Sequence, residues 1–257
     1  MQRRKYPRFL INMVKAVAYK VYKLGEKATT PPLDRYDFQT FDLLKRVLPS
    51  DANCIDVGAH TADILRKLVK YAPGGRHYAF EPIPWLYKDL QKNFGSKVTV
   101  MELALSDTRG EATFHAFPDR PAVSGLKQRQ FPGEDYAMVK FDVKLETLDH
   151  IIPEDLPIHL IKIDVEGAEL QVLRGGIRIL KKYKPFVLFE FGLGGSELYG
   201  TTPEQMFEFL EACGLSVSTL EYYMKGKAPF DKAEFVGQYE KKYNYFFIAY
   251  NAAEVKG

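Results

Sequence analysis

Residues 54–62 of the chain have the sequence CIDVGAHTA, and this short stretch indicates the fold. Its first four residues are mainly apolar and are typical of a buried strand. A turn containing Gly58 follows, and a helical pattern extends over residues 61–71. Glycine lets the backbone approach a ligand closely, and ligands of open α/β sheets bind beyond the carboxyl ends of the strands. The stretch therefore predicts a binding site at Asp56 and Gly58.

Apolar segments and helical patterns alternate along the chain on the C-terminal side of this stretch. Strands are predicted at residues 54–57, 77–80, 98–105, 159–165 and 186–191. Helices are predicted between most of them, at residues 61–71, 85–94 and 168–182. This alternation is typical of a mostly parallel sheet with helices on both faces, which is a three-layer, Rossmann-like α/β sandwich.

Two regions depart from the alternation. Residues 111–117 and 138–148 have the pattern of antiparallel strands, and the loop between them, residues 118–136, is rich in proline, glycine and charge. We expect this insertion to lie near the substrate. Residues 215–223 and 243–250 predict two further strands joined by a polar connection. They would form a hairpin that places an antiparallel edge strand near the C-terminus.

Length and composition favour one catalytic domain, residues 33–257, preceded by an extension and linker, residues 1–32. No apolar run reaches the roughly 20 residues that a transmembrane helix needs. The two cysteines, Cys54 and Cys213, are far apart, which argues against a disulfide framework or a zinc site. A cytoplasmic protein fits these features best.

The N-terminal extension is strongly basic. Residues 1–28 contain eight basic residues and one acidic residue, a net charge of +7, which leaves −4 for the rest of the chain. Apolar residues recur there at three- and four-residue steps, as on one face of a helix, and lysines interrupt the apolar run that an export signal would need. Two roles fit this pattern: docking on an anionic membrane surface, which would make the protein peripheral, or packing against the domain.

A second acidic residue supports a nucleoside site. Glu81 ends the strand at residues 77–80 and follows Asp56 by twenty-five positions, close to the roughly 20-residue offset at which a carboxylate binds ribose hydroxyls. Ile83 comes next, where the face of a base would pack. A nicotinamide dinucleotide would require three glycines in G-x-G-x-x-G, and this turn contains only Gly58.

Residues 160–169, LIKIDVEGAE, are the most informative stretch on the other side of the predicted site. An apolar strand ends in two carboxylates, so Asp164 and Glu166 should project towards the same cleft as Asp56. Lys162 shares a strand face with Asp164 and could pair with a carboxylate. Glu169 falls in the first turn of a helix, where the helix dipole favours an acid.

Taken together, these motifs resemble the FkbM family of S-adenosylmethionine-dependent methyltransferases. The similarity covers DVGA (56–59), FEPIP (80–84), ALSD (104–107) with Gly110, SGL (124–126), TLD (147–149), KIDVEGAE (162–169), Leu173 with Gly175, and the strand at 185–190. The resemblance implies a class I methyltransferase fold and O-methylation of sugar or polyketide-type hydroxyls. The predicted donor site comprises Asp56, Gly58, Ala59, Glu81, Pro82, Ile83, Leu105, Ser106, Asp107 and Asp164.

The chain departs from the family pattern at two positions. The family usually has asparagine where His60 stands and glycine where Ala62 stands. A methyl group at Ala62 would either tighten the packing of helix on strand or crowd the methionine part of the donor.

Catalysis requires a base for the acceptor hydroxyl. Asp164, Glu166 and His60 are the predicted catalytic residues, with Asp164 first, and Glu190 and His115 are further candidate bases. Asp164 and Glu166 could instead hold a divalent cation, although no metal site is favoured.

The acceptor is expected to be a small molecule or glycan. Arg120, Lys127 and Arg129 in the insertion would suit an anionic one, although loop charges are often simply solvated. The acidic core argues against a nucleic-acid substrate. The alternatives are a degenerate methyltransferase fold that serves as a binding or scaffold module and, less favoured, a nicotinamide-dependent oxidoreductase.

Overall fold

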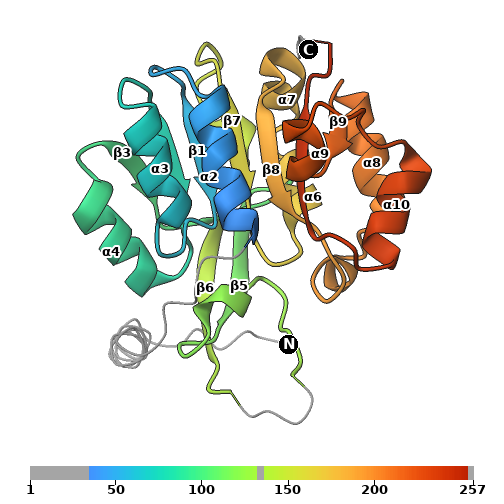
Figure 1. The fold of residues 1–257 in the computed structure, drawn as a ribbon. Helices are drawn as coiled ribbons and strands as arrows, with labels where there is room; N and C mark the ends of the chain where they lie inside the picture. Colours follow the sequence, from blue (N-terminus) through green and yellow to red (C-terminus); the bar gives the residue numbers. More distant parts are fainter. Residues whose placement is uncertain (1–34, 132–135, 254–257) are drawn as a thin grey trace.

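The computed structural model describes residues 35–131 and 136–253, so the predicted extension and linker lie outside the described residues. The described residues form a seven-stranded sheet covered by helices and a smaller three-stranded sheet beside it (Figure 1). The strand order of the large sheet is β3-β2-β1-β7-β8-β10-β9. This architecture confirms the predicted α/β class I methyltransferase fold with its mostly parallel sheet.

Five consecutive strands of the large sheet are parallel. They are β3 (Val98–Met101), β2 (His77–Phe80), β1 (Cys54–Val57), β7 (Leu160–Ile163) and β8 (Phe186–Glu190). Strand β10 (Phe246–Tyr250) runs antiparallel to β8 on one side and to β9 (Ser216–Ser218) on the other. The predicted antiparallel strand near the C-terminus is therefore present, and it is the second strand from the edge.

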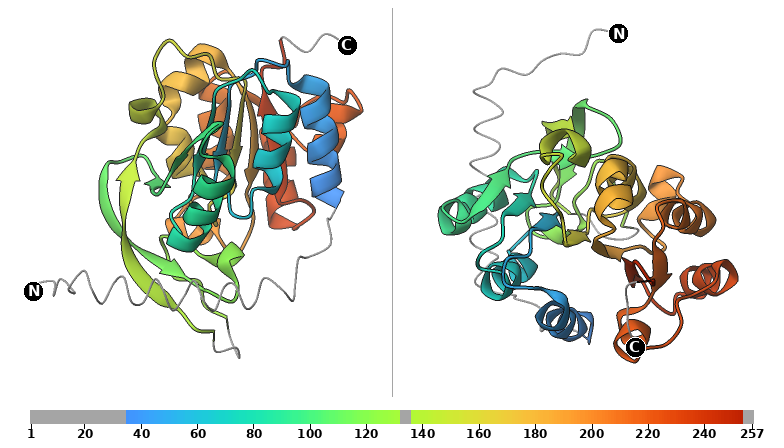
Figure 2. Two further views of the ribbon diagram at one scale, coloured as in Figure 1. Left: turned by 90° about the vertical axis from the view of Figure 1, so that its left-hand side faces the viewer. Right: turned by 90° about the horizontal axis from the view of Figure 1, so that it is seen from above.

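Helices cover both faces of this sheet because its buried residues alternate between two cores. On β7, Leu160 packs with α2 (Arg35–Val47), α3 (Asp63–Tyr71) and α9 (Leu220–Met224). Ile161 and Ile163 pack in the opposite core. That core includes α5 (Leu148–Ile151), α6 (Glu169–Arg174), α7 (Ile177–Tyr183), α8 (Pro203–Ala212) and α10 (Lys232–Glu240). The left view in Figure 2 shows α2 and α6 on opposite sides of the sheet.

Helix α4 (Pro84–Phe94) adds Leu90 to a smaller cluster with Ala79 and Val100 of the sheet. The predicted helix 168–182 is two helices, α6 and α7, separated at Gly175 and Gly176. Within the described ranges, no helix is both long enough and apolar enough to cross a membrane.

The small sheet has the order β4-β6-β5. Strands β5 (Gly110–Ala116) and β6 (Val139–Glu146) are the predicted antiparallel pair. The prediction of one strand over residues 98–105 was wrong, because the chain leaves the large sheet after β3 and β4 (Ala104–Leu105) pairs with β6. The insertion that follows β5 contains the short 3-10 helix η1 (Pro121–Val123).

The C-terminal region differs from the predicted pair of long strands. Only residues 216–218 form β9, and α9 follows where the strand was expected to continue. The polar connection contains α10, which begins with a capping box: the Asp231 side chain accepts the Glu234 N–H, and the Glu234 side chain accepts the Asp231 N–H. This Asp-x-x-Glu spacing is a helix-start signal in the sequence. A further 3-10 helix, η2 (Ser196–Tyr199), follows β8.

Candidate active site

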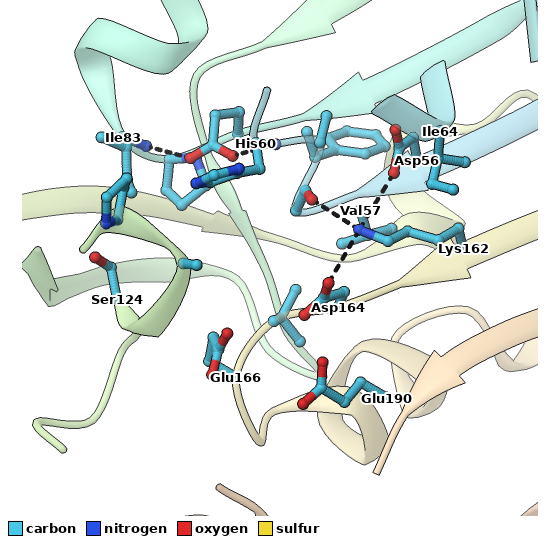
Figure 3. Close-up of a pocket in the computed structure, with 18 of the residues that line it drawn as sticks. Asp56, Val57, His60, Ile64, Ile83, Ser124, Lys162, Asp164, Glu166 and Glu190 are labelled. Carbon is cyan, nitrogen blue, oxygen red and sulfur yellow. Dashed lines mark hydrogen bonds and ion pairs between the residues drawn. The ribbon is translucent and has the colours of Figure 1, made fainter. Parts of the chain in front are cut away.

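A cavity of about 340 Å³ lies at the carboxyl ends of β1, β2 and β7. The chain runs outward from β1 through β2 to β3 in one direction, and β7 and β8 extend the sheet in the other. The strand order therefore reverses at β1, and ligands of open α/β sheets bind at such a reversal. Figure 3 shows side chains from both halves of the sheet around this cavity.

Gly58 allows the two halves of the large sheet to pack closely at the cavity. It has a φ of +72°, and a Cβ built on it would lie 1.9 Å from the carbonyl oxygen of Asp164. The glycine lines the cavity, as predicted, but its main constraint is different from the predicted approach of a ligand. It allows the turn after β1 to pack directly against the end of β7.

Glu81 is buried at the end of β2 and is held by backbone amides. The N–H of His60 donates to Oε2 and the N–H of Ile83 donates to Oε1, each over 2.9 Å. Burial raises the pKa of Glu81 to about 7, although both amides favour the charged form. The carboxylate has a fixed orientation and lines the cavity, so it can accept hydrogen bonds from a ligand.

Lys162 joins the two central strands through an ionic cluster. Asp56 and Lys162 are direct neighbours in the register of β1 and β7. The Lys162 ammonium lies 3.6 Å from Asp56 Oδ1 and 3.5 Å from Asp164 Oδ2, and it donates to the Gly58 carbonyl oxygen over 2.9 Å. Burial would lower the pKa of Lys162, but Asp164 and Asp56 outweigh it and raise that pKa. Burial raises the pKa of Asp56. The predicted pairing of Lys162 is thus present.

Three glutamates lie near Asp164. Glu166 adopts a φ of +62° and forms an ion pair of 2.7 Å with Arg129 from the insertion. Burial and the nearby Asp164 raise the pKa values of Glu166 and Glu190. Glu169, 1% exposed, accepts the N–H groups of Val165 and Gly167 at one oxygen, which fits the structural role predicted for it.

His60 lines the cavity. Burial lowers its pKa, and its Nε2 is buried without a hydrogen-bond partner. Ala62 does not line the cavity: it is 1% exposed and packs in the cluster that contains Leu65 and Ala79. Its φ is +71°. The first of the two predicted effects, tighter packing of helix on strand, therefore describes Ala62 better than crowding of the donor.

Most predicted site residues line the cavity. They are Asp56, Gly58, Ala59, His60, Glu81, Pro82, Ile83, Leu105, Asp164 and Glu166. Ser106 and Asp107 do not line it: the Ser106 hydroxyl donates to Asp107 Oδ1 within the turn after β4. The candidate base His115 also lies outside the lining, where its backbone pairs with Gly125.

Further walls of the cavity come from distant segments that the sequence did not predict. Tyr36, Asp37 and Thr40 of α2 line the cavity, as do Leu103 and Phe114. Ser124 and Leu126 of the insertion complete this wall. They belong to the SGL motif, residues 124–126, which was the one feature of the sequence that pointed to this part of the site. Among the described residues, no group of three or more His, Cys, Asp or Glu side chains could hold a metal ion.

The strand order, together with the open cavity beside β1, is that of the class I methyltransferase fold. The more specific family follows from the sequence: residues 56–217 match the Methyltransferase FkbM domain, and the chain belongs to this family.

Individual relatives match parts of the chain. A stretch of 159 residues is 31% identical to Methyltransferase sdnD of Sordaria araneosa and covers 50% of this chain and 61% of that protein. A stretch of 163 residues is 31% identical to 2-O-methyltransferase NoeI of Sinorhizobium fredii and covers 58% of this chain and 66% of that protein. The matches thus span less than two thirds of either relative.

Among solved structures, Methyltransferase FkbM from Methylobacillus flagellatus KT aligns with a TM-score of 0.47 at 15% identity. The alignment covers 92% of this chain and 59% of that one.

Proposed function

We propose that this protein is an S-adenosylmethionine-dependent O-methyltransferase that acts on a hydroxyl of a sugar, glycan or related small molecule. The observation that carries the proposal is the Glu81 carboxylate, which backbone amides of His60 and Ile83 orient into the cavity beside β1. A fixed carboxylate at the end of β2 suits the two ribose hydroxyls of an adenosyl group.

The remaining walls of the cavity suit the other parts of that donor. Ile83, Leu103 and Phe114 offer apolar surface for the adenine. Asp56 has both carboxylate oxygens buried without a hydrogen-bond partner, and Asp164 is about one third exposed. These two carboxylates would face the donor's ammonium group, with Lys162 limiting their mutual repulsion.

The bound donor would supply an activated methyl group, so the protein has to hold the acceptor oxygen in line with it and receive a proton. Asp164, Glu166 and His60 line the cavity as candidate groups for that proton. The 2-O-methyltransferase relative supports oxygen as the acceptor atom.

Calorimetry with S-adenosylmethionine, S-adenosylhomocysteine and NAD tests donor use. We expect both sulfur compounds to bind and NAD to give no heat. Binding of NAD alone would favour an oxidoreductase, and binding of none would favour the scaffold role.

Transfer of a labelled methyl group tests the reaction. The protein is incubated with methyl-labelled S-adenosylmethionine and cell-derived glycans and lipids, and the products are analysed by NMR. A methyl ether carbon is the expected product. A label found only on nitrogen or carbon would contradict O-methylation.

The basic segment, residues 1–28, motivates a second proposal: a cytoplasmic enzyme at the inner face of an anionic membrane. Each basic residue near such a surface contributes about 1 kcal/mol. Flotation with anionic liposomes should carry the full chain further than a chain that lacks residues 1–28, and equal flotation would dismiss the proposal.

A further inference from the structure

A second cavity, of about 310 Å³, adjoins the first near the end of β8. The first cavity is bounded by β1, β2 and the small sheet, whereas the second lies between the loop after β8 and the residues that follow α10. Of the residues that the structure describes, three line both cavities: Glu166, Glu190 and Tyr245. Figure 3 shows Glu166 and Glu190 on the same side of the first cavity as Asp164.

Methyl transfer requires the acceptor oxygen to approach the methyl carbon to roughly 3 Å. If the first cavity holds the donor and the adjoining cavity holds the acceptor, the reacting atoms meet where the two cavities adjoin. The residues that line both cavities are then the ones next to the reacting atoms.

We propose that the second cavity binds the acceptor and that Glu190 is the catalytic base that takes the proton of its hydroxyl. This inference rests on the proposed function, since it assumes that the first cavity holds the methyl donor.

The ion pairs in this region favour Glu190 over its neighbours. Arg129 lies 2.7 Å from Glu166, and the Lys162 ammonium lies 3.5 Å from Asp164. Arg129 thus occupies the Glu166 oxygen that it faces, and that oxygen is not open to the acceptor's proton, although burial raises the pKa of Glu166 to about 9. Asp164, moreover, lines the first cavity alone.

Glu190 is in a setting that strengthens a base. Burial, with Asp164 and Glu169 nearby, raises its pKa to about 8, although Arg129 and Lys162 act in the opposite direction. Lys242, a further cation, lines the second cavity together with Glu190. A pKa near neutrality is the most effective for a general base.

Arg129 is placed as a positioning residue for Glu166. A Cβ on Gly195 would lie 2.6 Å from its guanidinium, so this glycine makes room for Arg129. Gly167 and Gly195 also meet through their backbones, since a Cβ on Gly167 would lie 2.3 Å from the Gly195 carbonyl oxygen. These contacts fix the loop after β8 against the loop after β7.

The balance of charges points to a neutral, polyhydroxylated acceptor. Glu166, Glu169 and Glu190 line the second cavity and outnumber its cations, Arg129 and Lys242. Carboxyl groups form hydrogen bonds with hydroxyls in either protonation state, and once ionised, as a base such as Glu190 has to be for catalysis, they repel anions. The half-exposed ring of Tyr245 adds a flat apolar surface. The anionic acceptor considered for Arg129 is therefore disfavoured.

In the step itself, the acceptor oxygen forms a bond to the methyl carbon while the bond from that carbon to sulfur breaks. The electron pair of the broken bond stays on sulfur, which becomes a neutral thioether. The hydroxyl proton passes to the Glu190 carboxylate, and the products are a methyl ether and a carboxylic acid.

The first test compares Glu190→Gln with Glu190→Asp and with Glu211→Gln, a change at an exposed carboxyl on α8. The probes are methyl glycosides of neutral hexoses, with glucuronic acid as the anionic counterpart. We expect Glu190→Gln to lower kcat by about 10²- to 10⁴-fold while the donor Kd stays within twofold. Glu190→Asp should recover part of the rate, and Glu211→Gln should match the wild type.

The pH profile separates a base from a structural residue. The wild-type kcat/KM should rise with pH through about 8 as Glu190 ionises, and Glu190→Gln should lose this rise. A wild-type rate or an unchanged profile in Glu190→Gln would overturn the assignment of the base.

The second test blocks the cavity. Leu193→Trp changes an exposed side chain that lines the second cavity, and Leu198→Trp changes an equally exposed one that lines neither cavity. Only Leu193→Trp should raise the KM for the glycoside, by at least tenfold, with the donor Kd unchanged. Equal KM values would overturn the acceptor site.

The outcomes for the wild type distinguish the two levels of the proposal. A wild type that does not bind S-adenosylmethionine contradicts the proposed function itself. A wild type that binds it but methylates only glucuronic acid, or none of the probes, contradicts the neutral acceptor class.

Discussion

The two cavities that meet at Glu166 and Glu190 hold their carboxyl groups in different ways. In the first, both oxygens of Glu81 accept backbone N–H groups, and nearby walls such as Ile83 and Phe114 are apolar. In the second, Glu166 depends on a side chain, Arg129, which comes from a distant insertion.

The difference indicates which role suits each cavity. Backbone amides fix a carboxylate wherever the local turn forms, so the position of Glu81 in the first cavity depends mainly on the turns that follow β1 and β2. The second cavity depends on side chains that influence one another's charge, which suits proton exchange and a variable acceptor. Changes in the backbone should therefore damage the first cavity most, and changes of charge the second.

The largest effect is expected from Gly58→Ala, which would destroy the contact between β1 and β7. Gly200→Ala is the matched control, because Gly200 has a similar φ, +67°, but no atom lies within 4 Å of its added Cβ. The control should cost about 1 kcal/mol of unfolding free energy for the left-handed backbone. Gly58→Ala should cost at least about 4 kcal/mol in urea unfolding. Similar costs for the two variants would show that the backbone shifts easily enough to separate the added methyl group from the Asp164 carbonyl oxygen.

Lys162→Met would remove a buried charge that lines the first cavity. Asp56, 1% exposed, would lose its cation, and we expect a loss of about 3 kcal/mol in stability at neutral pH.

The pH dependence of this loss has a definite sign. Lys162 lowers the pKa of Asp56, which burial raises, so the variant should raise that pKa further. A carboxyl whose folded-state pKa exceeds its unfolded value, about 3.9, contributes stability at low pH and loses it as the pH rises. The difference from the wild type should therefore shrink between pH 7 and pH 5 in urea titrations. A constant difference would show that Asp56 does not titrate in that range.

Glu81→Gln tests the first cavity alone. Its amide nitrogen would face one of the two backbone N–H groups, and the charge that should bind the ribose would be lost. An effect of about 1.5 to 3 kcal/mol corresponds to an S-adenosylmethionine Kd weaker by about 10- to 100-fold in calorimetry. The glycoside KM should stay the same, and a raised KM with unchanged donor Kd would reverse our assignment of the two cavities.

Donor binding should also depend on pH through Glu81. Burial raises the pKa of this group to about 7, and the ionised form is the better acceptor. The affinity for S-adenosylmethionine should fall by about tenfold between pH 8 and pH 6, as the ionised fraction does. Glu81→Gln should remove this slope. If the slope persists in the variant, another group controls donor binding.

The smallest effect is expected from Ala62→Gly, which restores the residue typical of the family. Because Ala62 packs in the core beside the first cavity and does not line it, the donor Kd should change by less than twofold. The unfolding free energy should change by no more than about 1 kcal/mol, since relief of the positive φ opposes the added chain entropy. A clearly tighter donor Kd would show that the methyl group crowds the donor.

Local patterns were enough to predict the parallel strands and the first cavity. Asp56, Glu81 and Asp164 each end an apolar strand, and parallel strands bring their carboxyl ends to one edge of the sheet. The same reasoning failed for Ser106 and Asp107, because the chain enters the small sheet at β4 and the two residues that follow it do not line the cavity. It also missed α10, although its capping box is visible in the sequence.

The sequence by itself determined the class of fold, the family and the strand-end carboxylates, since these depend on periodicity and on residues close together in the chain. Only the tertiary structure decided that Lys162 bridges Asp56 and Asp164, that Arg129 pairs with Glu166, and that Glu190 borders two cavities. Such contacts join segments far apart in sequence, and the raised pKa values follow from burial, which no local pattern of residues specifies.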